Sequence, residues 1–152
     1  MPLLTDRDLY ALGEQHNAIT EAKERAAFYA AHLYPALRDR FLALPPADPP
    51  VEILLLPVSQ AHAPILTAAR WKPRVAFAIY STLSQRHQSF IEEQITALGL
   101  NIIAEGRTVE GIEIEPGRLY TAIKEILQPY LNPGNDNAHI ALERVEKVPV
   151  AR

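Results

Sequence analysis

Two short polar segments, each directly after an apolar run, contain the side chains best suited to hold a small anion. They are Ser59, Gln60 and His62 after the first run, and Ser81, Thr82 and Ser84 after the second. Hydroxyl, amide and backbone N–H groups donate hydrogen bonds to phosphate oxygens, and the free N–H groups that open a helix favour negative charge. An imidazole adds a group that gains or loses a proton near neutral pH. These types and positions predict binding of a phosphate-bearing ligand.

Each of these residues also has a purely structural interpretation. Ser59 or Gln60 can cap the helix that follows them, and Ser81 or Thr82 can cap the next helix along the chain. His62 can be an inert loop histidine. A serine that caps a helix can still contact a ligand, because both roles use the same corner rich in free amides. Both interpretations therefore stay open at the level of the sequence.

Positive charge for such a site is sparse. Arg107, in Gly106-Arg107-Thr108 beyond a third expected strand, is the likeliest charged helper, with an ordinary surface role as the alternative. Arg86 and His87 are expected to face solvent, with a ligand contact as the lesser alternative. The five histidines have no spacing typical of metal ligands, so no metal site and no cofactor are predicted. Without a recognisable nucleophile and base motif, the catalytic residues stay unassigned.

The elements that position these residues are two continuous apolar runs, Val51–Leu56 and Val75–Tyr80. Runs of this kind are typical of parallel strands buried on both faces. Between them, Ile65–Trp71 can form a short helix that Lys72-Pro73 ends. In open parallel sheets, ligands bind outside the carboxyl ends of the strands, which is where the polar segments lie.

The rest of the chain continues the alternation of helices and strands. We expect a helix at Leu83–Leu98 ended by Gly99, then a strand at Leu100–Ala104 and a helix at Pro116–Gln128. Between the last two, the polar connection Glu105–Glu115 can hold a short extended piece at Val109, Ile112 and Ile114. A loop over 132–137 and a last strand at His139–Val145 complete the pattern. The fold class is α/β, a Rossmann-like parallel sheet with flanking helices.

A helical arm comes before this domain. The segment Thr5–Leu44 has an apolar stripe, a capping Thr5, and Pro35, which should kink the helix near Tyr34. The domain prediction is an arm over 1–44, a Pro-rich linker over 45–50 and the Rossmann-like domain over 51–152. The stripe can contact a second copy of the chain, connect to an effector segment or pack on its own sheet. The Pro-rich linker and the length of the arm favour the second copy.

Composition excludes several classes of protein. The chain has 152 residues and a net charge of −3, and it has no basic stripe. These features argue against an extended binding surface for duplex DNA or RNA. It has no cysteine, which removes disulfides and thiol chemistry. No apolar run approaches the roughly 18 residues of a membrane span. The first residues lack the layout of a signal peptide, so we expect a cytoplasmic protein.

The region from Val51 to Leu131 resembles the CARF family, the Rossmann-like sensor domains of type III CRISPR systems. The residues that carry the resemblance are Val58-Ser59-Gln60 after the first strand, Lys72-Pro73-Arg74-Val75 at the entry to the second, and the segment SFIEEQITALGLNI. The resemblance implies a cyclic oligoadenylate bound across the two-fold axis of a homodimer, and so a nucleotide-binding role in antiviral defence. The chain departs from the family after Leu131, where no Gly-Gly-Thr-Lys type loop follows.

Three functions are consistent with these observations. The first is a sensor domain that binds cyclic oligoadenylate and relays the signal. The second is a metal-independent ring nuclease that cleaves this ligand, in which the protein orients a 2′-hydroxyl for attack. The missing loop lowers the expectation of cleavage more than that of binding, because some family members use its lysine in cleavage. The third is an α/β interaction domain without a ligand.

Overall fold

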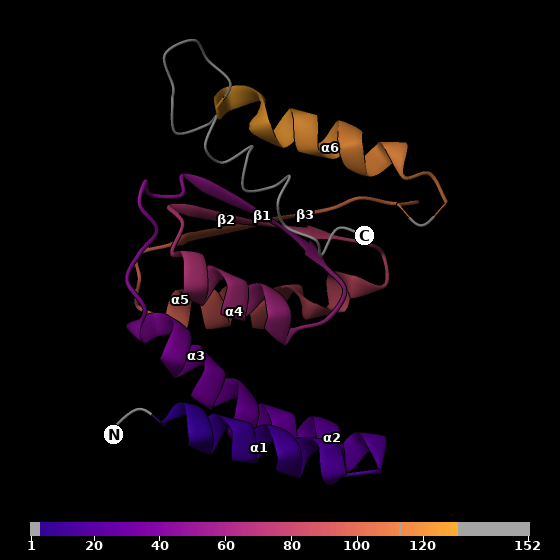
Figure 1. Cartoon of the computed structure of the whole chain (residues 1–152). Helices are drawn as coiled ribbons and strands as arrows, with labels where there is room; N and C mark the ends of the chain where they lie inside the picture. Colours follow the sequence, from indigo (N-terminus) through magenta and orange to yellow (C-terminus); the bar gives the residue numbers. More distant parts are fainter. Residues whose placement is uncertain (1–3, 113, 131–152) are drawn as a thin grey trace. The chain divides into compact units, whose positions relative to one another are not determined.

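The computed structural model describes residues 4–112 and 114–130. The chain divides into two compact units, Met1–Pro45 and Pro46–Arg152 (Figure 1). The boundary lies at the start of the Pro-rich stretch that separates the helical arm from the predicted sheet domain.

The first unit is made of helices, but not of one continuous helix. It contains α1 (Asp6–Ala18), α2 (Ala22–Phe28), the π-helical turn η1 (Tyr29–Leu33) and α3 (Tyr34–Ala43). Thr5 caps α1 as predicted, in a capping box with Asp8. The expectation of an unbroken helix up to Pro35 was wrong, because the chain leaves helical geometry at Ile19. Glu21 then caps α2, because its carboxylate accepts hydrogen bonds from the N–H groups of Lys23 and Glu24 in the first turn of that helix.

Near Tyr34, where the sequence predicted a kink or a split, the structure has the π-helical turn, and helical geometry continues through it. The N–H of Tyr34 donates to the carbonyl of Tyr29, five residues back, and α3 begins there with Pro35 in its first turn. Proline has no N–H to give to the preceding turn, and its ring crowds the carbonyl there. A wider turn before the proline accommodates both effects.

The second unit is built on a three-stranded parallel sheet in the order β1-β2-β3. The strands are β1 (Ile53–Val58), β2 (Val75–Tyr80) and β3 (Ile103–Thr108). The predicted α/β fold with parallel strands is confirmed. The third strand was expected at Leu100–Ala104 and lies further along the chain. The polar residues of β3 made it hard to recognise as a strand. It is one of the two edge strands of the described sheet, and an edge strand tolerates polar side chains that the central strand excludes.

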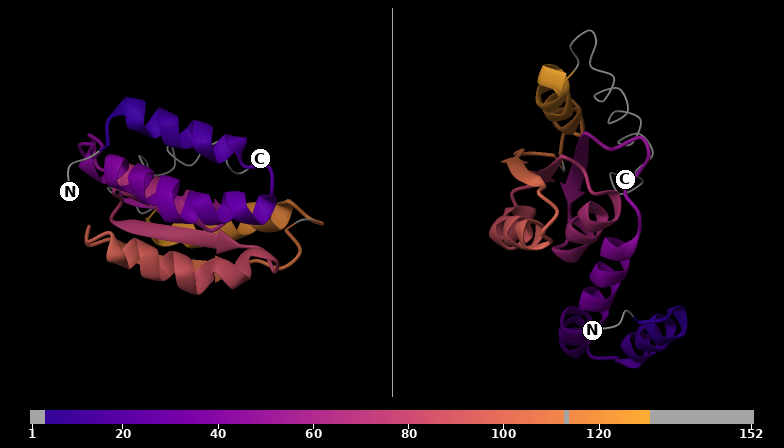
Figure 2. Two further views of the ribbon diagram at one scale, coloured as in Figure 1. Left: turned by 90° about the horizontal axis from the view of Figure 1, so that it is seen from below. Right: turned by 90° about the vertical axis from the view of Figure 1, so that its left-hand side faces the viewer.

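Helices cover both faces of the sheet. The helices α4 (His62–Trp71) and α5 (Gln88–Ala97) lie on one face, and α6 (Gly117–Leu127) lies on the other (Figure 2). Two single 3₁₀ turns complete the described part, η2 (Ser84–His87) before α5 and η3 (Gln128–Tyr130) after α6. The predicted glycine at the end of α5 is confirmed, since Gly99 has a φ of 71°. Among the described residues, no helix has the length and apolar character that crossing a membrane requires.

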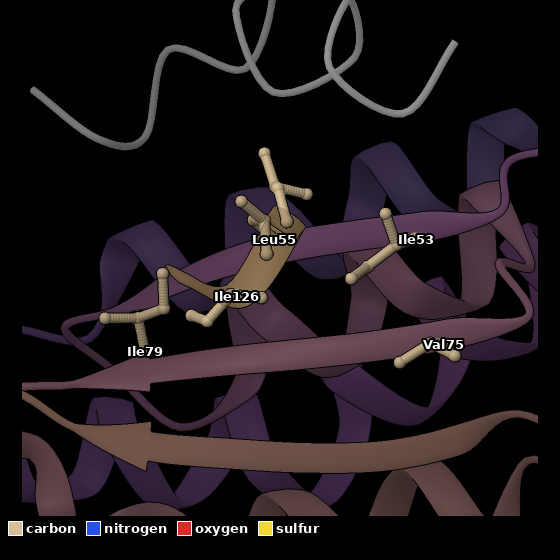
Figure 3. Packing of buried hydrophobic residues seen from close by; sticks show 6 residues of the cluster. Ile53, Leu55, Val75, Ile79 and Ile126 are labelled. Carbon is tan, nitrogen blue, oxygen red and sulfur yellow. The ribbon is translucent and has the colours of Figure 1, made fainter. Parts of the chain in front are cut away.

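The core between α6 and the sheet holds the strands in place. Its buried residues come from β1, β2 and α6 (Figure 3), and they are Ile53, Leu55, Val75, Ile79, Ile126 and Leu127. Val109 and Ile112 pack against this cluster, while Ile114 is 85% exposed. The predicted extended piece that contains these three residues was wrong, because a turn follows directly after β3. The predicted loop over 132–137 and strand at His139–Val145 lie outside the described residues.

Candidate functional site

The two polar segments leave the sheet side by side. Val58 ends β1 and pairs with Tyr80, which ends β2. Ser59 and Ser81 come next on each strand. Because the strands are parallel, both segments start from the same carboxyl edge, which is the usual ligand position in open sheets of this kind.

Ser59 and Gln60 are exposed and line a cavity of about 110 Å³. The other lining residues come from β1 and α4, and they are Leu56, Pro57, Ala63, Pro64 and Thr67. Pockets that enclose a whole small-molecule ligand usually have about 300–1,000 Å³. This cavity is therefore of a size for one phosphate group and not for a whole nucleotide.

The first turn of α4 keeps its amides available. No side chain in the described part of the chain caps this helix, so the capping role considered for Ser59 and Gln60 is not adopted. The helix has ten residues, and its first N–H groups have no partner within the helix. They lie beside the cavity that Ser59 and Gln60 line. A phosphate there would meet backbone donors and the positive end of a helix dipole.

Ser81 and Ser84 have their hydroxyl groups engaged with each other. The N–H of Ser81 donates to Ser84 Oγ at 2.8 Å, and the N–H of Ser84 donates to Ser81 Oγ at 3.1 Å. Ser84 is 5% exposed. This reciprocal arrangement closes the turn after β2. In the described part of the chain no side chain caps η2 or α5, so the capping role considered for Ser81 and Thr82 is not adopted. Thr82 is exposed at the same corner, and Ser81 is half-buried.

His62 opens α4 and lies against α5. Its ring meets the ring of Phe90 edge-on, with 5.6 Å between centroids. Burial lowers the pKa of His62, and the nearby positive charge of His87 lowers it further. A second basic group thus stands close to His62. Two histidines and an aromatic ring from different helices converge where the two polar segments emerge.

Arg86 belongs to the same group, and it is exposed, as the sequence predicted. Its Nε donates to His87 Nε2 at 3.4 Å. Within the described ranges, no carboxylate lies at ion-pair distance from Arg86. The signal that could have identified it is its position, a few residues beyond the end of a buried parallel strand.

Arg107, in contrast, is separated from Ser59 and already paired. It lies within β3, and its guanidinium forms an ion pair with Glu125 of α6 at 2.5 Å. It lines another cavity, of about 480 Å³, whose residues are Arg107, Val109, Glu115, Gly117, Arg118, Thr121, Ala122 and Glu125. Arg118 in this cavity is also paired, with Glu115. Each arginine there has a carboxylate partner, so the cavity offers little net charge to an anion.

The predicted site residues therefore fall into two groups. The segments after β1 and β2 share one edge of the sheet, with the basic residues His62, His87 and Arg86 beside them. Arg107 lies in a separate cavity under α6. The first group combines uncapped helix amides, a small cavity, basic side chains and an aromatic ring. That combination can bind a phosphate group with an attached base.

Comparison with models of known protein families finds no match, and no curated protein matches the chain.

Proposed function

We propose that this protein is a cyclic oligoadenylate-binding sensor of type III CRISPR antiviral signalling, acting as a homodimer. The observation that carries the proposal is the carboxyl edge of β1 and β2. The start of α4, which has no side-chain cap, lies at the first polar segment, and Arg86, which has no carboxylate partner among the described residues, lies at the second. The nature of the ligand follows from the resemblance of Val51–Leu131 to the CARF family.

A phosphate of the ligand would occupy the small cavity beside Ser59 and Gln60. Backbone amides of α4 would donate to its oxygens, and Arg86 would supply the charge that the amides lack. A charge-assisted hydrogen bond of this kind contributes about 1.5–3 kcal/mol. Loss of Arg86 would therefore weaken binding by about tenfold to a hundredfold.

An adenine base has suitable surfaces close by. Phe90 is 38% exposed, and its ring contacts that of His62, which opens α4 just after the first polar segment. Leu83, 76% exposed, presents apolar surface next to Thr82. Stacking of a base on an aromatic ring contributes about 1–3 kcal/mol. A ring of linked adenylates contains several phosphates and several bases. Two copies of the chain, each with the carboxyl edge of β1 and β2, could therefore bind one ring together.

The test is calorimetric titration of the chain with cyclic tri-, tetra- and hexa-adenylate. We expect one of them to bind the parent, and Arg86→Ala to weaken that binding at least tenfold. Arg74→Ala is the matched control, because Arg74 lies at the opposite end of β2 and pairs with Glu52. Equal loss in both variants, or no binding of any ring by the parent, would refute the proposal. Chromatography of the ligand after timed incubation would separate a sensor from a ring nuclease.

A further inference from the structure

Among the described residues, no strand pairs with the outer edge of β3, so its outward backbone groups have no ladder partner there. The side chains of β3 alternate between exposed and half-buried, and Ile103 is 48% exposed. The N–H of Ile103 donates to the carbonyl of Arg74, and the N–H of Val109 donates to that of Tyr80. Odd-numbered residues thus direct their N–H and C=O groups towards β2. Even-numbered residues direct theirs outward, since successive residues of a strand alternate.

The outward groups belong to Ala104, Gly106 and Thr108. Such a row of unpaired donors and acceptors is a template for another strand. We propose that the occupant is a second copy of this chain, whose β3 pairs antiparallel with this one about a two-fold axis at Gly106. Gly106 then lies opposite the partner's Gly106, and Ala104 opposite the partner's Thr108. Both are pairs of outward-facing residues, as the hydrogen bonds of an antiparallel ladder require.

Charge complementarity selects this register. With Gly106 at the axis, Glu105 lies directly opposite the partner's Arg107, and Arg107 opposite the partner's Glu105. Opposite charges at such positions stabilise a strand pair, and like charges destabilise it. Moving the axis to Glu105 would place two glutamates face to face. Moving it to Arg107 would place two arginines face to face. Of the three neighbouring registers, only the central one pairs unlike charges.

The apolar residues at the ends of β3 agree with the same register. Ile103 lies opposite the partner's Val109, on the face that also carries Glu105 and Arg107. Each exposed Ile103 therefore gains an apolar neighbour. Arg107 keeps its ion pair with Glu125 and still has capacity for the partner, because a guanidinium has five N–H donors and this side chain is 43% exposed.

This interface is distinct from the one that a shared ligand would need. Since the paired strands run in opposite directions, the carboxyl edges of the two sheets point away from each other. The β3 pairing therefore does not rest on the proposed function, and separate experiments test it. If both interfaces form, the assembly is larger than a dimer, so the sedimentation tests of the β3 pairing are made without cyclic oligoadenylate.

Charge reversal tests the pairing, with Glu125→Gln as background so that Arg107 acts only across the strand edge. The parent and Glu125→Gln should both sediment as dimers at about 100 μM. Adding Glu105→Arg should raise the dimer dissociation constant tenfold or more, because both symmetric pairs become repulsive. Adding Arg107→Glu as well should restore the dimer. A monomeric parent, or a folded double reversal that stays monomeric, would overturn the proposal.

Cysteine cross-linking tests the register directly, because the chain has no cysteine of its own. Opposed residues of a pair without ladder hydrogen bonds have Cα atoms about 4.5 Å apart, within reach of a disulfide. The Ile103→Cys, Val109→Cys variant should form a covalent dimer under mild oxidation, and neither single variant should. Cross-linking by Ile103→Cys alone would show another register and refute this one. So would a double variant that remains monomeric.

Discussion

Gly106 lies where β3 passes over the ring of Tyr80, and the geometry gives a definite expectation for Gly106→Ala. A Cβ atom added there would lie 2.8 Å from Tyr80 Cε2, closer than real Cβ contacts. The ring cannot simply move aside, because Tyr80 has no exposed surface and ends the central strand. Overpacking of a well-filled core costs typically about 1–3 kcal/mol, so the free energy of unfolding should fall by about that amount.

The assay is guanidinium unfolding followed by tryptophan fluorescence. Trp71 is the only tryptophan, and it ends α4 in the sheet-containing unit, so the signal reports that unit. Gly117→Ala is the matched control, because a Cβ there meets nothing within 4 Å. It should leave the transition midpoint unchanged or raise it slightly. An unaltered midpoint for Gly106→Ala would show that β3 and Tyr80 are not packed as described, and would refute the reasoning.

Three further predictions follow from the same region. Among the described residues, the buried hydroxyl of Tyr80 has no hydrogen-bond partner. Tyr80→Phe should therefore raise the free energy of unfolding by about 1 kcal/mol in the same assay. A loss of stability would instead show that the hydroxyl has a partner. Burial, with the nearby charge of His87, lowers the pKa of His62 from 6.5. The unfolded chain then binds that proton more readily, so stability should fall as the pH drops below about 6.5, and His62→Gln should reduce this dependence; equal pH profiles would contradict it. Ser84→Ala should cost about 0.5–2 kcal/mol in thermal or guanidinium unfolding, as loss of a cap does, whereas its exposed neighbour Thr82→Ala should cost almost nothing.

Much of the sheet could be predicted because its first two strands are chemically uniform. The runs that became β1 and β2 are apolar throughout, a pattern that fits few environments besides a buried parallel sheet. Breakers also act locally, so Gly99 and Pro35 disturbed the helices where the sequence placed them. These features depend on neighbours within a few residues, which a sequence displays directly.

The outer strand and the arrangement of the site were harder to predict. β3 contains Glu105 and Arg107, and their acceptability depends on an open edge that only the folded sheet defines. The ion pair of Arg107 with Glu125 joins residues 18 positions apart, so no local sequence pattern could predict it. Arg86 is exposed as predicted, but that no carboxylate of the described residues pairs with it is a property of the folded neighbourhood, which the sequence does not display.

The most direct test of the central claim is calorimetry of the parent chain with cyclic oligoadenylates, beside Arg86→Ala and Arg107→Ala. If the ligand site is the carboxyl edge of β1 and β2, one ring binds the parent. Arg86→Ala then weakens it about tenfold or more, while Arg107→Ala changes the affinity little. Loss of binding in Arg107→Ala with full affinity in Arg86→Ala would place the site in the other cavity. Failure of every ring to bind the parent would contradict the account outright.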